Sequence, residues 1–229
     1  MRLATLVLFA AVACLPTNAL AEDTPREIVV TGEGSVAAAP DMAVISLGVT
    51  NEARLAGEAM ERTSRAMADV LATLETAGIA LGDIQTSSVS LSPRWDHSQR
   101  DTAPRVIGYV ASNALRVRVR DLDLLGGVLD SVIGSGANQM NGLSFALSDP
   151  RPVEDQARAA AVGDARQKAV VLAEAAGITL GPIRRISEGS FGGGGPVMMQ
   201  EARMGAAVPI AAGEVETSVS VTVVFDIAE

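Results

Sequence analysis

The hydrophobic pattern divides the chain into short strand-like and longer helix-like segments. Alternation of β-branched and polar residues predicts strands over residues 27–33, 42–50, 84–95, 106–119, 143–147 and 214–227. A Gly/Ala/Pro turn is expected at residues 34–40, between the first two strands. The polar segment 96–104 is typical of a hairpin loop, which would make the two strands flanking it antiparallel neighbours.

Three segments have helical rather than strand periodicity. Residues 55–77 place one apolar stripe on a helical face: Ala59, Thr63, Ala66, Met67, Val70, Leu71 and Leu74. Asp121 can cap a shorter helix over residues 122–133. Pro150 and Pro152 open a long alanine-rich helix over residues 153–176, on which Asp164 and Lys168 form an i,i+4 charge pair. Small alanines would allow this last helix to approach a sheet closely.

One sequence segment is repeated in a second place. Residues 74–84 read LETAGIALGDI and residues 173–183 read AEAAGITLGPI, a constant offset of 99. Each copy would lead a helix through a glycine C-cap at Gly78 or Gly177 into a strand. We therefore predict an α+β fold, with mixed sheets packed against helices and two related helix-to-strand units. Residues 22–229 form this domain, with an alternative division into subdomains at about 22–104 and 105–229.

The N-terminus has the pattern of an export signal. Arg2, the apolar run 3–15 and the small-residue site Ala19-Leu20-Ala21 predict a signal peptide over residues 1–21. The apolar run is shorter than the roughly 20 residues that span a bilayer, so no transmembrane segment is expected after cleavage. Cleavage would remove Cys14, the one cysteine, whose lipidation is an open alternative. These features predict a periplasmic protein that was secreted across the inner membrane.

The overall charge narrows the classes of partner. The formal net charge is −9, and loss of Arg2 with the signal peptide makes it more negative. Non-specific nucleic-acid binding and attachment to anionic membranes both need basic surfaces, so neither is expected.

Two motifs resemble parts of enzyme sites. Gly32-Glu33-Gly34 imitates the start of a dinucleotide-binding motif, but Pro40 and a second strand pattern follow where that motif needs a helix N-terminus. Trp95, Asp96 and His97 contain the only histidine, which supports a hydrolase as a minor alternative. No nucleophile elbow accompanies His97, and a metal site there would lack thiolates and a second imidazole. We predict no catalytic, cofactor-binding or metal-binding residues, and no cofactor.

The segment 189–213 suggests an arm or mobile loop that orders against a partner. It contains the glycine run 192–195 and three methionines, Met198, Met199 and Met204. Methionines serve as adaptable apolar contacts at assembly surfaces. An alternative is that their thioethers scavenge oxidant or Cu(I) in an oxidising compartment.

Ordered motifs along most of the chain resemble those of the SIMPL-domain, or YggE-like, family. They are Ile28-x-Val30-x-Gly32-x-Gly34, Pro40-Asp41-x-Ala43-x-Ile45, Gly48-Val49, Asp83-Ile84-x-Thr86, Leu91-x-Pro93, Gly108-Tyr109-x-Ala111-x-Asn113 and Ala157-Arg158 to Ala165-Arg166-x-Lys168-Ala169. The resemblance implies an exported α+β protein that forms a large homo-oligomer, with a role in envelope or oxidative-stress tolerance. It supplies no agreed catalytic residues.

Together these features predict a non-enzymatic function. We expect an exported assembly or binding protein that forms a homo-oligomer through exposed strand edges and the segment 189–213. The identity of any small-molecule ligand is left open.

Overall fold

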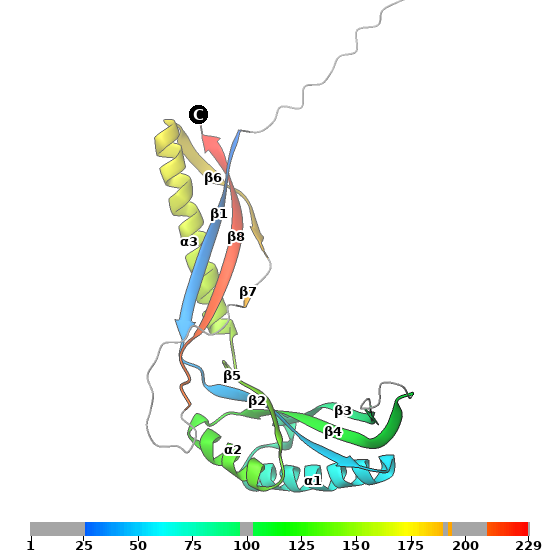
Figure 1. The fold of residues 1–229 in the computed structure, drawn as a ribbon. Helices are drawn as coiled ribbons and strands as arrows, with labels where there is room; N and C mark the ends of the chain where they lie inside the picture. Colours follow the sequence, from blue (N-terminus) through cyan, green and yellow to red (C-terminus); the bar gives the residue numbers. More distant parts are fainter. Residues whose placement is uncertain (1–25, 97–102, 190–191, 194–209, 229) are drawn as a thin grey trace, which may run out of the picture.

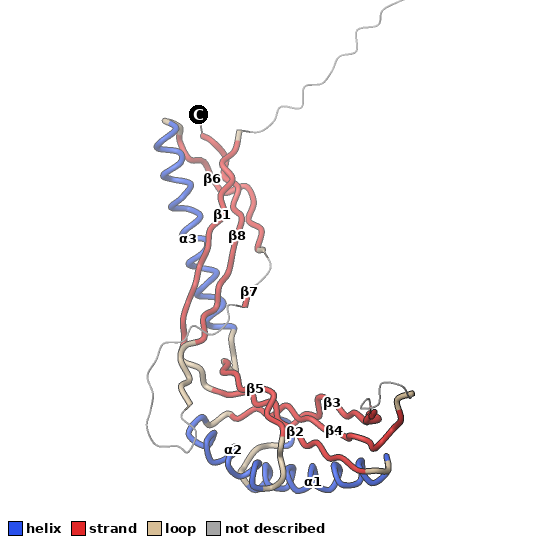
Figure 2. Tube along the Cα trace, viewed as in Figure 1, coloured by secondary structure: helices blue, strands red, loops and turns tan. Residues whose placement is uncertain are grey.

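The molecule consists of two halves that meet in the shape of an L. A computed structural model describes residues 26–96, 103–189, 192–193 and 210–228 (Figure 1). Each half is an antiparallel sheet with helices on one of its faces (Figure 2). The predicted α+β class is therefore confirmed.

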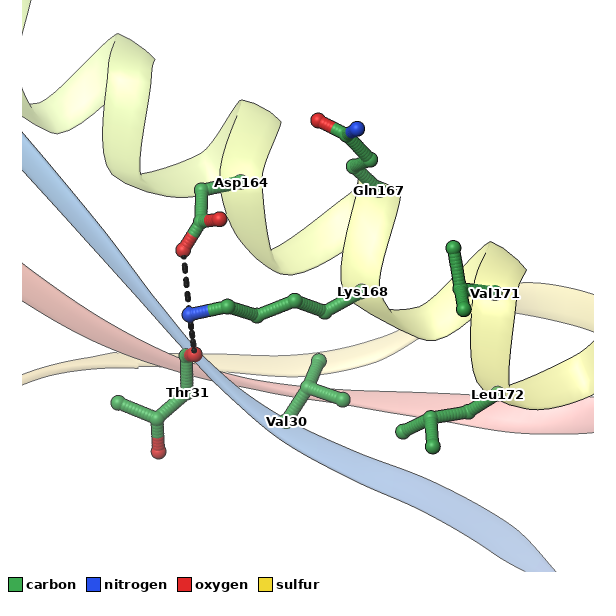
Figure 3. A pocket seen from close by; sticks show the side chains of 7 residues that line it. All are labelled: Val30, Thr31, Asp164, Gln167, Lys168, Val171 and Leu172. Carbon is green, nitrogen blue, oxygen red and sulfur yellow. Dashed lines mark hydrogen bonds and ion pairs between the residues drawn. The ribbon is translucent and has the colours of Figure 1, made fainter.

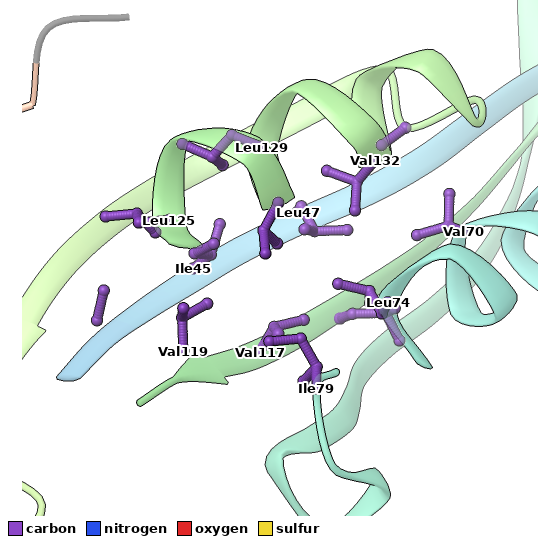
Figure 4. Packing of buried hydrophobic residues seen from close by; sticks show 14 of the residues in the cluster. Ile45, Leu47, Val70, Leu74, Ile79, Val117, Val119, Leu125, Leu129 and Val132 are labelled. Carbon is purple, nitrogen blue, oxygen red and sulfur yellow. The ribbon is translucent and has the colours of Figure 1, made fainter. Parts of the chain in front are cut away.

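The first half, here called the α1 half, has the strand order β3-β4-β2-β5. Its strands are β2 (Met42–Ala53), β3 (Ile84–Asp96), β4 (Arg105–Val119) and β5 (Gln139–Ala146). The helices α1 (Ala56–Thr76) and α2 (Leu125–Gly134) cover one face, and the short 3-10 helices η1 (Leu81–Asp83) and η2 (Leu122–Leu124) precede β3 and α2. The core between sheet and helices is aliphatic, and includes Ile45, Leu47, Val70, Leu74, Val117 and Leu129 (Figure 4).

The second half, here called the α3 half, is built from the two ends of the described chain. Its strands are β1 (Glu27–Ala38), β6 (Thr179–Glu188), the two-residue β7 (Gly192–Gly193) and β8 (Val215–Ala228). The order is β1-β8-β6, and β7 also pairs with β8. The helix α3 (Arg151–Ala176) lies along β1 and β8 on one face of this sheet (Figure 1).

The helix α3 lies unusually close to β1 because small residues line both sides of the contact. Its buried stripe consists entirely of alanine: Ala157, Ala161, Ala165, Ala169 and Ala173. On β1, a Cβ atom placed on Gly32 would overlap the backbone oxygen of Ala161 and lie 2.6 Å from the backbone nitrogen of Ala165. Gly34 meets α3 in the same way. The close approach expected from the alanines is thus confirmed, and glycines on the strand make it sterically feasible.

The turn predicted at residues 34–40 is wrong. The strand β1 continues through Gly34 to Ala38, and its last residues stay in register with β8 as far as the pair Ala38 and Val215. Glycine here relieves a steric clash with α3 instead of forming a turn. Only residues 39–41 connect β1 to β2.

The two halves do not correspond to subdomains divided after residue 104. That position lies between β3 and β4, which are neighbours in one sheet. The α1 half instead occupies a continuous segment, residues 42–146, between β1 and α3. The α3 half is completed only when the last strand, β8, pairs with the first, β1.

The repeated segments end their helices in the same way. Gly78 and Gly177 both have positive φ, 85° and 67°. Ile79 N donates to Leu74 O and Ile178 N donates to Ala173 O, each at 3.0 Å, which is the long hydrogen bond of a Schellman cap. The related helix ends predicted from the offset of 99 therefore have matching geometry.

Hydrogen bonds at the elbow tie together two of the connections between the halves. Asp41 accepts from the backbone N–H of Ser148 at 2.6 Å and from its hydroxyl at 2.5 Å. Asp41 N in turn donates to Ala146 O at 3.3 Å. Ile210, which precedes β8, packs against the core of the α1 half. The elbow is thus fixed by contacts from three crossing segments.

Replacement of Gly32 tests the close contact between α3 and β1. We expect Gly32→Ala to lower the free energy of unfolding by about 1–3 kcal/mol, because the added methyl group overlaps the α3 backbone. Gly163→Ala on the same helix is the matched control, since no atom lies within 4 Å of its Cβ position. It should raise stability by about 0.5–1 kcal/mol through helix propensity. Urea unfolding monitored by circular dichroism measures both, and similar effects of the two changes would contradict the packing.

The Asp41 carboxylate predicts a pH-dependent contribution to stability. The hydroxyl and backbone N–H of Ser148 lower the pKa of Asp41 below its ordinary value. The stabilisation is therefore complete above the unfolded-state pKa of about 3.9 and is lost as the pH falls through the lower folded-state pKa. We expect Asp41→Asn to cost about 1 kcal/mol at neutral pH. This difference from wild type should shrink below about pH 3.

Unfolding free energies measured from about pH 7 down to about pH 2.5 test this behaviour, since the loss begins as the pH falls below the unfolded-state pKa of about 3.9. Asp69→Asn, an exposed position on α1, is the control and should match wild type throughout. A cost of Asp41→Asn that stays constant over the whole range would show that the carboxylate is not responsible.

Candidate functional site

The strand β3 forms an outer edge of the α1 half. In the described part of the chain its one strand neighbour is β4, which leaves the backbone groups on its other side without a strand partner. Every residue from Gln85 to Trp95 is exposed. Residues 84–92 contain no charged residue and no proline, the side chains that usually protect an open edge. This edge is therefore chemically able to accept another strand.

Apolar side chains gather on the same hairpin. Val89 is 57% exposed, Leu91 42% and Trp95 48%, and Val106 and Ile107 on β4 are similarly exposed. The cause is the position of α1, which packs mainly over β2 and β4, so that of the apolar residues of β3 only Ile84 at its start joins the core. Leu91, for example, is paired with the fully buried Ala111 yet has no helix above it. The β3 edge thus combines open hydrogen-bonding groups with apolar area.

Ion pairs hold both ends of β3 in place. Before the strand, Arg120 binds Asp83 through two hydrogen bonds of 2.7 and 2.8 Å, which lower the pKa of Asp83. Near its other end, Arg94 reaches across β4 and pairs with Glu52 on β2. An edge that is already ordered loses little conformational entropy when a second strand binds.

On β1, an edge strand of the α3 half, side chains already bind backbone groups of the free edge. Glu33 N donates to Asp164 Oδ2 at 2.8 Å, and Lys168 Nζ donates to Thr31 O at 3.1 Å. Asp164 and Lys168 also pair with each other at 2.7 Å (Figure 3). The hydrogen bonds lower the pKa of Asp164, and Asp164 raises the pKa of Lys168, so both stay charged over a wide pH range.

An open groove of about 440 Å³ lies at this point between α3 and β1. Val30, Val171 and Leu172 provide its apolar lining, and the Asp164–Lys168 pair crosses it (Figure 3). Each charge in the groove already has a partner of opposite sign, so the geometry offers no free charged group to a small ligand.

Those residues singled out for enzyme chemistry that the structure describes are not brought together. Gly32, Glu33 and Gly34 lie within β1, far from any strand-to-helix turn. Trp95 and Asp96 end β3, and Asp96 lies 3.8 Å from Arg105 across the hairpin. His97 lies outside the described residues, as do Met198, Met199, Met204 and Gly194–Gly195 of the segment 189–213. The hydrolase and methionine hypotheses therefore stay untested predictions, as does the signal peptide over residues 1–21.

The motif around Tyr109 and Asn113 lies on β4 and is partly buried. Tyr109 packs against a small cluster of Ala53, Ala59 and Ala111 beneath α1. The Oδ1 atom of Asn113 is buried without a hydrogen-bond partner among the described residues. Within those residues no group of three His, Cys, Asp or Glu side chains could hold a metal ion.

The comparisons with known proteins agree with the motifs. Residues 28–225 match the SIMPL family, described as "Protein of unknown function (DUF541)", and the chain belongs to this family. It is 41% identical over 216 residues to the 26 kDa periplasmic immunogenic protein of Brucella melitensis biotype 1, covering 89% of this chain and 85% of that protein. It is 31% identical over 156 residues to the uncharacterized protein YggE of Escherichia coli K12, covering 68% and 63%. No helix in the described ranges is long and apolar enough to cross a membrane.

Proposed function

We propose that this protein is a periplasmic, non-enzymatic assembly protein whose copies associate through the free edge of β3. The observation that carries the proposal is the uncharged, exposed strand over residues 84–92, with Val89 and Leu91 projecting beyond the cover of α1. Location in the periplasm is supported by the predicted signal peptide and by the name of the Brucella relatives. A role in envelope or stress tolerance is what the family resemblance implies.

A second copy of the chain suits this edge better than a charged partner. The chain carries a net charge of −9, so two copies repel each other over most of their surfaces. The β3 edge is a stretch where that repulsion is weak, because residues 84–92 are uncharged. Two β3 strands placed antiparallel would satisfy each other's backbone groups and bury their apolar side chains.

The native mass of the mature chain tests the proposal. Light scattering after gel filtration should give a discrete mass larger than one chain. Val89→Lys should shift it toward the monomer, since a cation on each copy would face the pairing edge. Ile133→Lys is the matched control: Ile133 is 55% exposed on α2, against 57% for Val89, and lies away from the β3 edge. A wild-type monomer, or equal effects of the two changes, would contradict assembly through β3.

Trp95 provides an independent signal because it is the only tryptophan. It is 48% exposed in the single chain, so its fluorescence should be quenched readily by acrylamide when the protein is dilute. Assembly through β3 should shield it and shift its emission to shorter wavelength as concentration rises. An emission that stays constant while the mass increases would place the contact elsewhere.

A further inference from the structure

At the centre of the free edge of β1, side chains of α3 already bind the outward-facing backbone groups. In the pair with β8, alternate residues of β1 direct both backbone groups toward the edge away from β8. Thr31 and Glu33 are two such residues in succession, and the Thr31 oxygen and Glu33 N–H are consecutive hydrogen-bonding groups on this edge. A strand that joined β1 here would use both groups, whether it ran parallel or antiparallel.

The pair of Asp164 and Lys168 occupies both of these groups. Lys168 donates to the Thr31 oxygen and Asp164 accepts from the Glu33 N–H, so the two side chains reproduce what a neighbouring strand would supply (Figure 3). They reach the edge because the contact of Gly32 and Gly34 with the alanine stripe brings α3 close to β1. The i,i+4 pair of Glu58 and Arg62 on α1, by contrast, makes no contact with a strand edge.

Displacing this pair would be costly for an incoming strand. It would have to break the 2.7 Å ion pair and both hydrogen bonds, and the freed Lys168 would lie beside Val30 and Leu172. Both side chains are partly exposed, Lys168 at 47% and Asp164 at 33%, so the obstacle is chiefly that an incoming strand would replace two hydrogen bonds that already exist and would gain little. In the described chain, residues 84–92 of β3 have no such side-chain cover from a charged pair.

We propose that Asp164 and Lys168 act as an edge guard, which prevents β1 from pairing with an extended segment of a second copy. The guard rests on the proposed assembly function, because it closes one of the sheet edges that a second copy could otherwise use. Its removal should open β1 as an additional association site.

The test removes the guard in a background where β3 is blocked. Asp164→Ala and Lys168→Ala are introduced together into Val89→Lys, which leaves net charge unchanged and keeps two good helix formers on α3. Glu58→Ala with Arg62→Ala is the matched control, an exposed i,i+4 pair that touches no strand edge. Far-UV circular dichroism checks that both variants fold, and light scattering compares each mass with its parent. We expect at least a doubling of mass for the guard variant and no change for the control.

Amide exchange at Glu33 provides the second readout. In dilute protein, where association is negligible, loss of the Asp164 acceptor should speed this exchange about tenfold. Lys168→Met, which keeps the apolar stem but cannot donate to Thr31, should increase association if the double variant fails to fold. An unchanged mass in the guard variant overturns the proposal, and so does a Glu33 exchange rate equal to that of the parent.

The two proposals fail in different ways. A wild-type chain that is monomeric at all concentrations contradicts assembly through β3, and the guard is then tested by the same double substitution in wild type. A wild-type assembly combined with no effect of the double substitution contradicts the guard alone.

Discussion

The close packing of α3 on β1 is the contact on which the α3 half depends. Gly32 and Gly34 remove the Cβ atoms that would collide with the helix backbone, and the alanine stripe lets the helix come as near as the strand allows. On the helix side of this core, dispersion attraction between closely spaced backbones takes the place of large side chains, while the strands still contribute residues such as Ile28 and Phe225. The same closeness brings Asp164 and Lys168 within hydrogen-bonding reach of the strand edge. One steric constraint thus sets both the packing of this half and the chemistry of its outer strand.

The edge strands β1 and β3 differ in how far a helix covers them, because the helices of the two halves are placed differently. The helix α3 lies over the edge strand β1, whereas α1 and α2 leave the edge strand β3 exposed from Gln85 to Trp95. An uncovered edge with apolar side chains is either an aggregation hazard or a functional contact. The ion pairs that hold β3 at both ends, Asp83 with Arg120 and Glu52 with Arg94, favour a functional contact. The proposed assembly and the proposed guard are therefore two consequences of one difference in helix coverage.

Much of this architecture could be predicted from local sequence signals. The buried face of α1, the cap at Asp121, the glycine caps at Gly78 and Gly177 and the β3–β4 hairpin all depend on residues close together in the sequence. The turn at 34–40 was wrong because glycine and proline suggest turns, while at Gly32 and Gly34 the actual constraint comes from a helix more than a hundred residues away. The pairing of β1 with β8 joins the two ends of the chain and leaves no local signal. Asp164 and Lys168 were identified as a helix pair, but their contacts with β1 depend on that distant packing.

Amide hydrogen exchange on the wild-type protein, compared between dilute and assembled samples, tests the central claim that the β3 edge is open and the β1 edge is closed. The account predicts that exchange in residues 84–92 slows on assembly, because a second strand takes up their outward N–H groups. Exchange in residues 27–33 should be the same in both samples, because the guard already occupies the centre of that edge. Slower exchange in residues 27–33 with no change in residues 84–92 would contradict the account.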